Sequence, residues 1–574
     1  MSKQKEKWLV AAKKADFSAI AQKYGIDQVT ARIIRNRGMI EDADIAKYLR
    51  PDLEGLYSPH QMKDLDCLVG ILQEKIKGQK KIRVIGDYDI DGIQSTYILV
   101  KGIQRAGGIV SNAIPDRVKD GYGINENLIA QAKEDGMDTI VTCDNGIAAI
   151  DAIAYAKELG LTVLVTDHHD IPYKEEGGVR TYRKSLADAI VNPKQSGCNY
   201  PFNGICGAVV AFKVVQALYE ACQIPASEAM EFLENAAFAT VGDVMDLVDE
   251  NRIIVKYGIE QMRQSKNRGF RALVAQKEVQ PKKLSAYHLG FVLGPCLNAS
   301  GRLDTAVRSL KLLMAKEEGE AAELAAELAD LNEERKKMTL DGLKEAINLI
   351  ESQHLDKQKV MVVYLPTLHE SLAGIVAGRI REKYNHPVFV MTQSEGGVKG
   401  SGRSIEPYSM YEELCKCQDL FLKFGGHPMA AGLSLPEANL AAFVERINAY
   451  ASLSDEDFTP RVHIDVPMPL SYVTKELVQE LQVLEPFGKG NGKPVFADRD
   501  IRVVDRRIVG KNKNVLKMVL EDGMGNRYPG VYFGDVEEFL EFLDKKDVVS
   551  VVYYPEINRY MGRDEVQFVI SNYC

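Results

Sequence analysis

Short apolar runs separated by amphipathic segments dominate the chain from residue 82 to residue 165. The runs are each five or six residues long and occupy residues 82–86, 109–114, 138–143 and 161–165. Apolar residues recur with helical spacing between them, notably at residues 95–106 and 148–159. Because strands that alternate with helices assemble in parallel, this region predicts an α/β domain built on a parallel sheet.

The chain on either side of this region is predicted to be mostly helical. Residues 1–75 look helical and mixed in character. Residues 207–219 and 227–247 predict two helices, the second with Ser227 as its N-cap. Residues 316–352 are rich in Ala, Glu, Leu and Lys, with leucines on one face, which is typical of a long helix that joins two domains.

Two further patterns follow. A second αβ unit begins at Val360 with the apolar run VMVVYL and continues with a helix near residues 372–384 and a strand at residues 387–391. It contains the glycine-punctuated segments KGSGRS and FGGHPMAAG. After Ser454 apolar and polar residues alternate, as in IRVVDRRIV and VVSVVYY, which predicts a small β-barrel.

Composition narrows the class of protein. Of the 574 residues, 45% are hydrophobic and 27% are charged, which excludes a disordered or collagen-like chain. No run approaches the roughly 18 consecutive apolar residues of a membrane-spanning helix, and the nine cysteines form no CxxC pair. We therefore expect a soluble, cytoplasmic protein with no membrane partner. The net charge of −9 argues against general coating of nucleic acid but allows a local basic groove.

Acidic residues and histidines collect directly after the predicted strands. They are Asp87, Asp89, Asp91, Asp144, Asp167, His168 and His169. Because the carboxyl ends of parallel strands share one edge of a sheet, these loops should converge on one site. Carboxylates gathered without basic partners repel one another unless a cation neutralises them, and this ligand set suits Mn²⁺ or Mg²⁺. We expect two such cations and phosphoryl hydrolysis. Asp243 is either a further ligand or a surface acid.

These motifs resemble a known family. GDYDIDG, CDNG and the Asp-His-His triplet at residues 167–169 are similar to the first motifs of the DHH phosphoesterase superfamily. HESLAGIVAGRI, KGSGRS and GGHPMAAGL are similar to its DHH-associated nucleic-acid-binding domain. PDRVKDGYG, GPCLNASGR and EPFGKGNGKPVF resemble segments of the single-strand-specific DNA exonucleases of that superfamily. The resemblance covers about residues 80–574.

Pattern and resemblance together imply an α/β protein with a parallel-sheet DHH domain, a long helix, a second α/β (DHH-associated) domain and an OB-like β-barrel. The expected parts are a mainly helical N-terminal segment (1–75), the DHH catalytic domain (76–310), the linker helix (311–352), the DHH-associated domain (353–454) and the OB-like DNA-binding domain (455–574).

The resemblance also assigns roles at the acidic site. The metal ligands would be Asp89, Asp91, Asp144, His168 and Asp243. The catalytic residues would be His169, Asp144 and Asp87, with Asp87 as a further ligand or as support for one. His169 would contact or protonate the scissile phosphate, since imidazole titrates near neutrality.

Further residues are expected to contact nucleic acid. They are Arg117, Tyr122, Asn298, Arg302, Arg379, Ser401, Arg403, Gly425, Gly426 and His427. Glycines let backbone approach a phosphate closely, whereas Arg379 could instead cap its helix or pair with an acid. Tyr88 and Phe487 are further candidates for base stacking or for packing. Cys296 departs from the pattern, because the family often has arginine there, so one contact is expected to be absent.

A basic stretch could hold DNA on this acidic chain. Residues 501–517 carry six basic residues against the single acid Asp505, namely Arg502, Arg506, Arg507, Lys511, Lys513 and Lys517. In an oligonucleotide-binding barrel such residues, Arg506 and Arg507 among them, would follow the phosphates. The alternative is a solvated strand face.

The resemblance implies a monomeric, single-strand-specific 5′-to-3′ DNA exonuclease that releases mononucleotides in DNA repair and recombination. Single-stranded DNA is the expected partner, with single-strand-binding protein and a helicase as candidate protein partners. A narrow cleft between two domains would exclude a duplex. Two alternatives stay open. A small-substrate DHH phosphodiesterase of oligoribonuclease or cyclic-dinucleotide type is disfavoured by the C-terminal barrel, and an inactive DHH replication scaffold is disfavoured by the complete acidic and histidine motifs.

Overall fold

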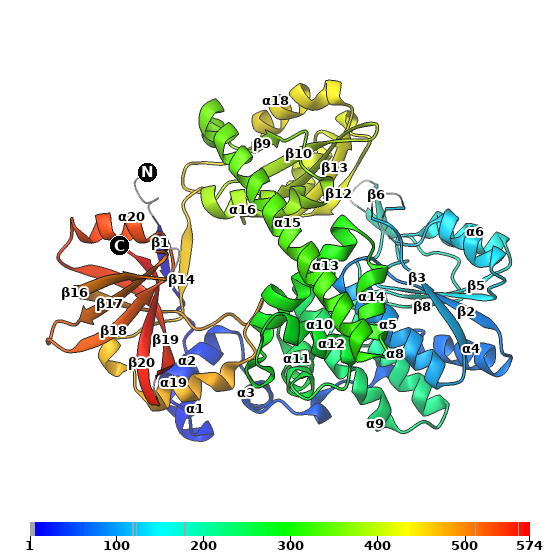
Figure 1. The fold of residues 1–574 in the computed structure, drawn as a ribbon, viewed down its shortest axis with the longest axis horizontal. Coiled ribbons are helices and arrows are strands. Elements are labelled where there is room, and N and C mark those ends of the chain that lie inside the picture. The colour runs from blue at the N-terminus through cyan, green and yellow to red at the C-terminus, as the bar shows by residue number, and fades with distance from the viewer. Residues whose placement is uncertain (1–5, 118–119, 122, 177–178, 511–512, 561) are drawn as a thin grey trace. The chain divides into compact units, whose positions relative to one another are not determined.

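The computed structural model describes residues 6–117, 120–121, 123–176, 179–510, 513–560 and 562–574. It divides into two compact units (Figure 1). Unit 1 consists of Trp8–Gly294 and Val462–Cys574, and unit 2 consists mainly of Pro295–Arg461. The first unit therefore brings together the predicted catalytic region and the C-terminal barrel, which are far apart in sequence.

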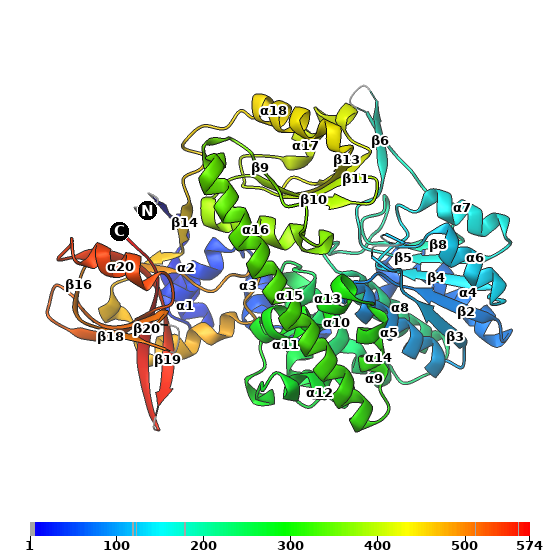
Figure 2. The same ribbon diagram turned by 45° about the horizontal axis from the view of Figure 1, so that its top comes forward.

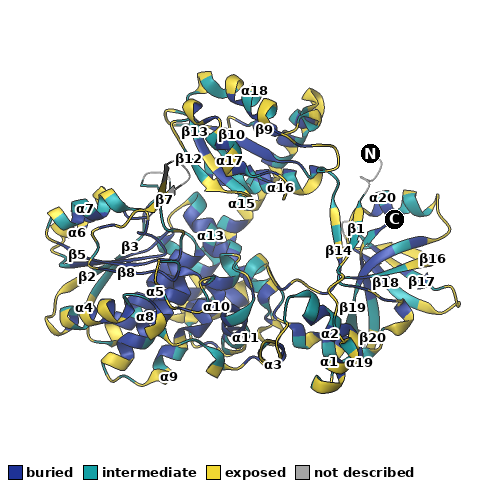
Figure 3. Cartoon of the chain, turned by 180° about the vertical axis from the view of Figure 1, so that it is seen from behind, coloured by how far each residue is buried: buried dark blue, intermediate teal, exposed yellow. Residues whose placement is uncertain are grey.

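A five-stranded parallel sheet forms the centre of the first half of unit 1, as predicted. Its strand order is β3 (Ile109–Ala113), β2 (Lys81–Ile85), β4 (Thr139–Cys143), β5 (Thr162–Thr166) and β8 (Ala189–Val191). Every residue of β4 is buried, and the strands of this sheet are largely dark blue, the colour of buried residues, in Figure 3. Helices cover both faces, which is why the strands are continuous apolar runs rather than alternating ones.

Two layers of helices enclose this sheet. The helices α6 (Glu126–Glu134) and α7 (Ile150–Glu158) pack on one face, where their apolar residues join those of β2, β4 and β5 in one core. The helices α5 (Ile90–Arg105) and α8 (Gly207–Ala221) contact the strands from the other side. The acidic loops begin at the carboxyl edge of this sheet, where β2, β4 and β5 end.

The predicted helix over residues 227–247 starts within one residue of the observed one, but its N-cap and its C-terminal end are wrong. The segment forms α9 (Ala226–Ala229), a 3-10 turn at Met230–Phe232 and α10 (Leu233–Gly242). Ser227 lies inside α9, whose N-cap is Pro225 and which has no side-chain capping bond. Val244 adopts a left-handed conformation, with φ of 57°, so α10 stops and Asp243 becomes its C-cap. The helix end therefore presents Asp243 in a turn.

The predicted C-terminal barrel is present. Its sheet runs in the order β15 (Val466–Pro467), β16 (Phe496–Val509), β17 (Val515–Glu521), β18 (Arg527–Tyr532), β20 (Arg563–Tyr573) and β19 (Val549–Tyr560). Antiparallel pairing of β16 with β19 closes it. Apolar residues of α2 (Gln28–Asn36) and α3 (Asp42–Leu49) share the barrel's core. The N-terminal helices therefore pack as part of unit 1.

Unit 2 is a sheet with helices on both sides (Figure 2). Its strand order is β12 (Lys423–His427), β13 (Ala430–Leu435), β11 (Gly397–Arg403), β10 (Val388–Ser394) and β9 (Met361–Tyr364). One side carries α16 (Ala373–Tyr384) and the long α15 (Glu318–Gln353), and the other carries α18 (Leu440–Tyr450) with the short α17 (Met410–Cys415). The long helix, the second αβ unit and its strand near residue 388 match the prediction.

Among the described residues, no helix is both long and apolar enough to cross a lipid bilayer.

Candidate metal centre and nucleic-acid surfaces

Three acidic loops meet at the carboxyl edge of the parallel sheet. They follow the adjacent strands β2, β4 and β5. Three groups of side chains could each hold a metal ion, because the ligand atoms within each group lie within 4.8 Å of one another. The groups are Asp144 with His168 and His169, Asp91 with His168 and Asp243, and Asp87 with Asp89 and Asp144. We call Asp87, Asp89, Asp91, Asp144, His168 and Asp243 the acidic cluster. All the residues named as metal ligands from the sequence thus lie together.

The first loop is folded tightly by a capping bond and a glycine. The Asp89 carboxylate accepts hydrogen bonds from the backbone N–H groups of Asp91 (2.9 Å) and Gly92 (3.1 Å), so it is the N-cap of α5. This bond explains why α5 begins at Ile90 rather than near residue 95. A Cβ on Gly92 would lie 2.4 Å from the Asp87 carbonyl oxygen, so only glycine allows the loop to close on itself.

Asp91 is held by the start of another helix. Its two carboxylate oxygens accept hydrogen bonds from the N–H groups of Gly207 (2.6 Å) and Ala208 (2.7 Å), in the first turn of α8. The positive end of the helix dipole favours a carboxylate there. Each oxygen has a second lone pair, and one of them lies 3.5 Å from His168 Nε2. Asp91 therefore both anchors α8 and faces the cluster.

The His168 ring lies among three carboxylates. Its Nε2 is 3.1 Å from Asp144 Oδ1 and 3.8 Å from Asp243 Oδ2, in addition to the contact with Asp91. Burial lowers the pKa of His168, which favours the neutral imidazole that metals bind. Its buried Nδ1 has no hydrogen-bond partner within the part of the chain that the structure describes.

The cluster carries more negative charge than its surroundings neutralise. Burial, and after it the neighbouring carboxylates, raise the pKa values of Asp87, Asp144 and Asp243 well above the ordinary range. Asp87 Oδ1 is also buried and receives no hydrogen bond from any described residue. A divalent cation would offset both the burial and the repulsion. Carboxylate oxygens with one imidazole fit Mn²⁺ or Mg²⁺.

His169 is paired with a fully buried carboxylate. Its Nδ1 lies 2.8 Å from Asp167 Oδ1, which also accepts the backbone N–H groups of His168 and His169. Burial alone would raise the pKa of Asp167, but the bond from His169 brings it below its usual value. Burial likewise opposes charge on His169, yet Asp167 raises the pKa of that imidazole to about 9. With 41% of its side chain exposed, His169 can hold a proton at the edge of the cluster.

An arginine stands beside the first acidic loop. The Arg117 guanidinium lies 4.9 Å from the centre of the Tyr88 ring, and Tyr88 is placed between Asp87 and Asp89 in the chain. The pair offers a cation and an aromatic face next to the cluster. Tyr122, predicted to stack on a base, and Lys511 lie outside the described residues.

Sheet register gathers the predicted contact residues of unit 2. Arg403 on β11 and His427 on β12 are both paired with Ala430 of the strand between them. Ser401 and Gly425 are likewise both paired with Gly432. Directly paired residues point to the same face of a sheet. A hydroxyl, a guanidinium and an imidazole thus lie on one face around Gly425, Gly432 and the small side chain of Ala430.

Arg403 and Arg302 both lie against the start of α16. A Cβ on Gly374, in its first turn, would lie 2.8 Å from Arg403 Nη2. Arg302 Nη1 donates to the Ser371 carbonyl at 2.8 Å, and Asn298 lies one turn before Arg302 on α13 (Gly294–Leu303). No carboxylate of the described chain pairs with Arg403, whose pKa is lowered by burial and then by Arg381. These features suit an anion.

The structure gives different explanations for the remaining predicted contact residues, Gly425, Gly426 and Arg379. Gly426 has φ of 147°, and a Cβ there would lie 2.5 Å from the Ala430 carbonyl oxygen, so the β12–β13 hairpin requires this glycine. A Cβ on Gly425 would meet nothing within 4 Å. Arg379 is 63% exposed and lies 3.2 Å from Glu382, which corresponds to the alternative of pairing with an acid.

Sequence reasoning missed Arg335. This arginine on α15 is half-buried and has no carboxylate partner within ion-pair distance among the described residues. Burial lowers the pKa of Arg335, whereas Cys296 and Glu333 raise it and Arg379 lowers it further. A guanidinium therefore lies close to the position where the family often has arginine. The surrounding run NEERKK reads as a solvated helix face, so the sequence offered no signal.

The two barrel arginines differ in their partners. Arg506 lies 2.5 Å from Asp544, which offsets its charge. Arg507 is paired across the strands with Lys517, and both are exposed. Like charges placed opposite each other are unfavourable without a counter-ion, and no described carboxylate lies within ion-pair distance of either. Arg507 is therefore the better placed of the two to meet a phosphate.

Comparison with known proteins agrees with this architecture. The chain matches family models for the DHH family N-terminal domain at residues 81–240, the DHHA1 domain at residues 357–453 and the RecJ OB domain at residues 464–572. It is 35% identical over 558 residues to the single-stranded-DNA-specific exonuclease RecJ of Bacillus subtilis, covering 96% of this chain and 69% of that protein. The Escherichia coli protein of the same name is 33% identical over 549 residues, covering 92% and 93%.

Solved structures give the same result. RecJ from Thermus thermophilus in complex with Mn²⁺ has a TM-score of 0.84 at 28% identity, covering 99% of this chain and 79% of that chain. The complex of that protein with Mg²⁺ has a TM-score of 0.79, covering 99% and 78%.

Proposed function

Since the chain belongs to the RecJ family, we propose that it is a single-strand-specific DNA exonuclease that works from the 5′ end and releases mononucleotides. The observation that carries the proposal is the buried acidic cluster at the carboxyl edge of the parallel sheet, in the same compact unit as an OB barrel. Its setting is DNA repair and recombination.

The acidic cluster would hold two divalent cations, Mn²⁺ or Mg²⁺. We assign Asp89, Asp91, Asp144, His168 and Asp243 as ligands, with Asp87 as a further ligand or as support for one. When bound, such cations lower the pKa of water and offset charge on phosphoryl oxygens. Asp91 fixes the position of the cluster relative to α8, because its carboxylate accepts two hydrogen bonds from backbone N–H groups in the first turn of that helix.

His169 would serve the scissile phosphate. The Asp167 carboxylate keeps a proton on His169 Nδ1 and fixes the orientation of the ring. The resulting imidazolium can donate to a phosphate oxygen or protonate the departing 3′ oxygen. Asp167 is itself held by the N–H groups of Ile147, His168 and His169, so the pair is rigid.

Several surfaces would hold the strand. In unit 1 we assign Arg117 beside the first acidic loop, Arg506 and Arg507 on the barrel, and Tyr122. In unit 2 we assign contacts to Asn298, Arg302, Arg379, Ser401, Arg403, Gly425, Gly426 and His427. The separate sites would let an acidic protein bind a polyanion through local positive charge.

The proposed localisation, oligomeric state, protein partners and domain roles rest on membership of the family. The protein would act in the cytoplasm as a monomer, with single-strand-binding protein and a helicase as its partners. Its parts would be those expected from the sequence, with residues 76–310 as the catalytic domain and residues 353–454 and 455–574 contacting DNA. A DHH phosphodiesterase for small substrates would have no use for the barrel, and an inactive scaffold would have no use for the acidic cluster.

The test is digestion of end-labelled substrates with and without Mn²⁺. We expect mononucleotides from 5′-labelled single-stranded DNA at the earliest times, little digestion of blunt duplex, and no activity with chelator. Preferential cleavage of oligoribonucleotides a few residues long would favour the small-substrate enzyme, and no cleavage of any substrate would favour the scaffold. Asp144→Asn should lose activity, while Asp151→Asn, an exposed carboxylate on α7, is the matched control.

A further inference from the structure

The proposed function leaves one sequence motif without a role, the segment EPFGKGNGKPVF at residues 485–496. It lies in unit 1 and joins the 3-10 turn Leu481–Leu484 to β16 of the barrel. Within it, the N–H of Gly488 donates to the Asn491 carbonyl at 3.0 Å, and the N–H of Asn491 donates back to the Gly488 carbonyl at 3.2 Å. These two bonds fix the shape of residues 488–491, which we call the glycine turn.

The backbone that follows Asp243 is strained. Val244 has φ of 57°, a left-handed conformation that is costly for a β-branched residue. Val244 is also 60% exposed, so packing of its own side chain offsets little of that cost. A strained residue persists only where its surroundings fix it. The turn that places Asp243 within 3.8 Å of His168 therefore needs support from another segment.

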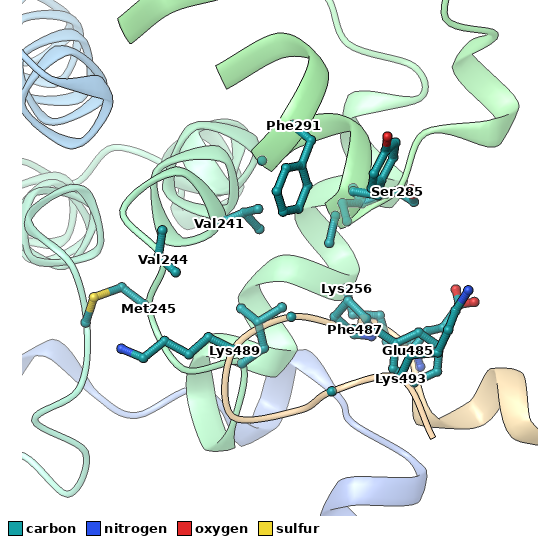
Figure 4. Close-up of a pocket in the computed structure, with 18 of the residues that line it drawn as sticks. Val241, Val244, Met245, Lys256, Ser285, Phe291, Glu485, Phe487, Lys489 and Lys493 are labelled. Atoms are coloured by element: carbon teal, nitrogen blue, oxygen red, sulfur yellow. The ribbon is translucent and has the colours of Figure 1, made fainter. Parts of the chain in front are cut away.

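The glycine turn supplies this support. The N–H of Leu247 donates to the Lys489 carbonyl at 2.7 Å. Lys489 also lines the same cavity of about 740 Å³ as Val244 and Met245 (Figure 4). Its ammonium lies 3.4 Å from the Asp246 carboxylate, but this ion pair is exposed and adds little. The main tie is therefore the backbone bond to the buried Leu247.

Two glycines allow the close approach of the two segments. Gly490 has φ of 71°, and a Cβ there would lie 2.9 Å from the Cβ of Asp246. A Cβ on Gly488 would lie 2.6 Å from Leu247 Cδ1. A Cβ on Gly492, by contrast, would meet nothing within 4 Å. Glycine is therefore required where the segment meets the turn after α10, and not at Gly492.

The N-terminal helices hold the glycine turn in place. The Asn491 side chain accepts hydrogen bonds from Tyr48 on α3 (2.7 Å) and from Arg37 at the end of α2 (2.6 Å). Its amide group donates to the carbonyls of Leu484 (2.9 Å) and Pro486 (2.8 Å). Asn491 is only 1% exposed. A buried side chain with four partners thus fixes the glycine turn relative to α2 and α3.

We propose that the glycine turn positions Asp243, so that Gly488 and Gly490 act as positioning residues for the cation that Asp243 would hold. The inference rests on the proposed function, in which Asp243 is a metal ligand. Asp243 belongs to only one of the three groups of possible ligands, with Asp91 and His168. Displacement of the glycine turn should therefore weaken the binding of one of the two cations and leave the other unchanged.

Titration of the full-length protein with Mn²⁺, followed by the electron paramagnetic resonance signal of the free ion, tests the inference. Gly490→Ala and Gly488→Ala should each weaken one of the two binding steps about 10- to 100-fold, the usual effect of losing a residue that orients a metal ligand. Asp243→Asn removes the ligand itself and sets the scale. Gly492→Ala, at an exposed glycine of the same segment, is the matched control and should bind as wild type. Wild-type affinity in both Gly490→Ala and Gly488→Ala would overturn the inference.

Two further measurements separate positioning from simple destabilisation. In chelator, the peptide that contains Leu247 should exchange its amide hydrogens faster in Gly490→Ala than in wild type, because the Lys489 carbonyl protects the Leu247 N–H. Calorimetry in chelator should show that Gly490→Ala still unfolds cooperatively. A segment that only joined the barrel to the rest of unit 1 would lower the melting temperature at unchanged Mn²⁺ affinity, and that result would also overturn the inference.

The two proposals fail differently. A wild-type protein that binds no Mn²⁺ overturns the proposed function, because the acidic cluster then holds no cation. Binding of two ions by wild type, with the same two affinities in Gly490→Ala and Gly488→Ala, overturns the role of the glycine turn alone. Wild-type affinity in Asp243→Asn removes Asp243 from the ligands and overturns the inference with it.

Discussion

Asp144→Asn should stabilise the metal-free protein and remove most of the stabilisation that metal gives, so that variant and wild type become about equally stable when metal is present. Asp144 is 2% exposed and has other acids of the cluster as neighbours. It also has a left-handed backbone, with φ of 60°, which asparagine tolerates far better than alanine does. The substitution therefore removes one negative charge while preserving shape and conformation.

The size of the effect follows from Coulomb repulsion. Ligand atoms of Asp144, Asp87 and Asp89 lie within 4.8 Å of one another. Two ionised carboxylates at that distance repel by about 3 kcal/mol at an effective dielectric constant of about 20. Protonation of some carboxylates relieves part of the total repulsion. We therefore expect the free energy of unfolding of the metal-free variant to exceed that of metal-free wild type by about 3 kcal/mol, the repulsion of one pair of carboxylates. Metal at a concentration of 100 times its Kd should raise the free energy of unfolding of the wild-type protein by about 2.7 kcal/mol. It should raise that of the variant much less.

The assay is scanning calorimetry of wild type and variant, in chelator and in Mn²⁺. We expect Asp144→Asn to melt several degrees above wild type in chelator and to respond little to Mn²⁺. Asp151→Asn makes the same chemical change on an exposed helix turn and should follow wild type in both conditions. A variant that melts below wild type in chelator, or that responds fully to Mn²⁺, would refute the reasoning.

Three further substitutions test other parts of the chain. Arg507→Gln should weaken binding of single-stranded DNA and reduce the slope of log affinity against log salt by about 0.7, whereas Arg506→Gln should do less because its charge is already paired; equal effects would contradict this. Burial raises the pKa of Glu234 to about 7 from 4.5, so its folded form loses stability as pH rises through that range. Glu234→Gln should remove this loss and stabilise the protein at pH 8 by about 3 kcal/mol in calorimetry, and an unchanged pH profile would refute it. Gly426→Ala should destabilise unit 2 by roughly 1–3 kcal/mol through backbone strain, while Gly425→Ala should leave its melting unchanged; equal melting of both would contradict the role of φ.

Local patterns in the sequence were sufficient for most of the elements and for the order of the motifs. The apolar runs before Asp87, Asp144 and Asp167 became adjacent parallel strands, because strands covered on both faces must be apolar throughout. Alternation after Ser454 became a closed barrel for the related reason that one face is buried and one is solvated. The helix over residues 227–247 was wrong because a helical period cannot reveal where a turn interrupts it.

Other features depend on contacts between distant segments. The sequence placed Asp91 in an acidic loop, but only the fold shows its two oxygens bound to the first turn of α8. It left Asp243 equally open as ligand or surface acid, and the end of α10 decided its place beside His168.

By itself, the sequence determined the type of each layer and the edge of the sheet where the acids collect, because strand and helix periods and strand-end loops are local. Only the tertiary structure decided which charged side chains lie close together, which apolar side chains pack in one core and which residues line one cavity. The helices α2 and α3 joined the barrel core, and residues near 241 and near 487 came to line one cavity. Such contacts depend on how side chains that are hundreds of residues apart fit together in shape and charge. The local pattern of apolar and polar residues carries no information about that fit.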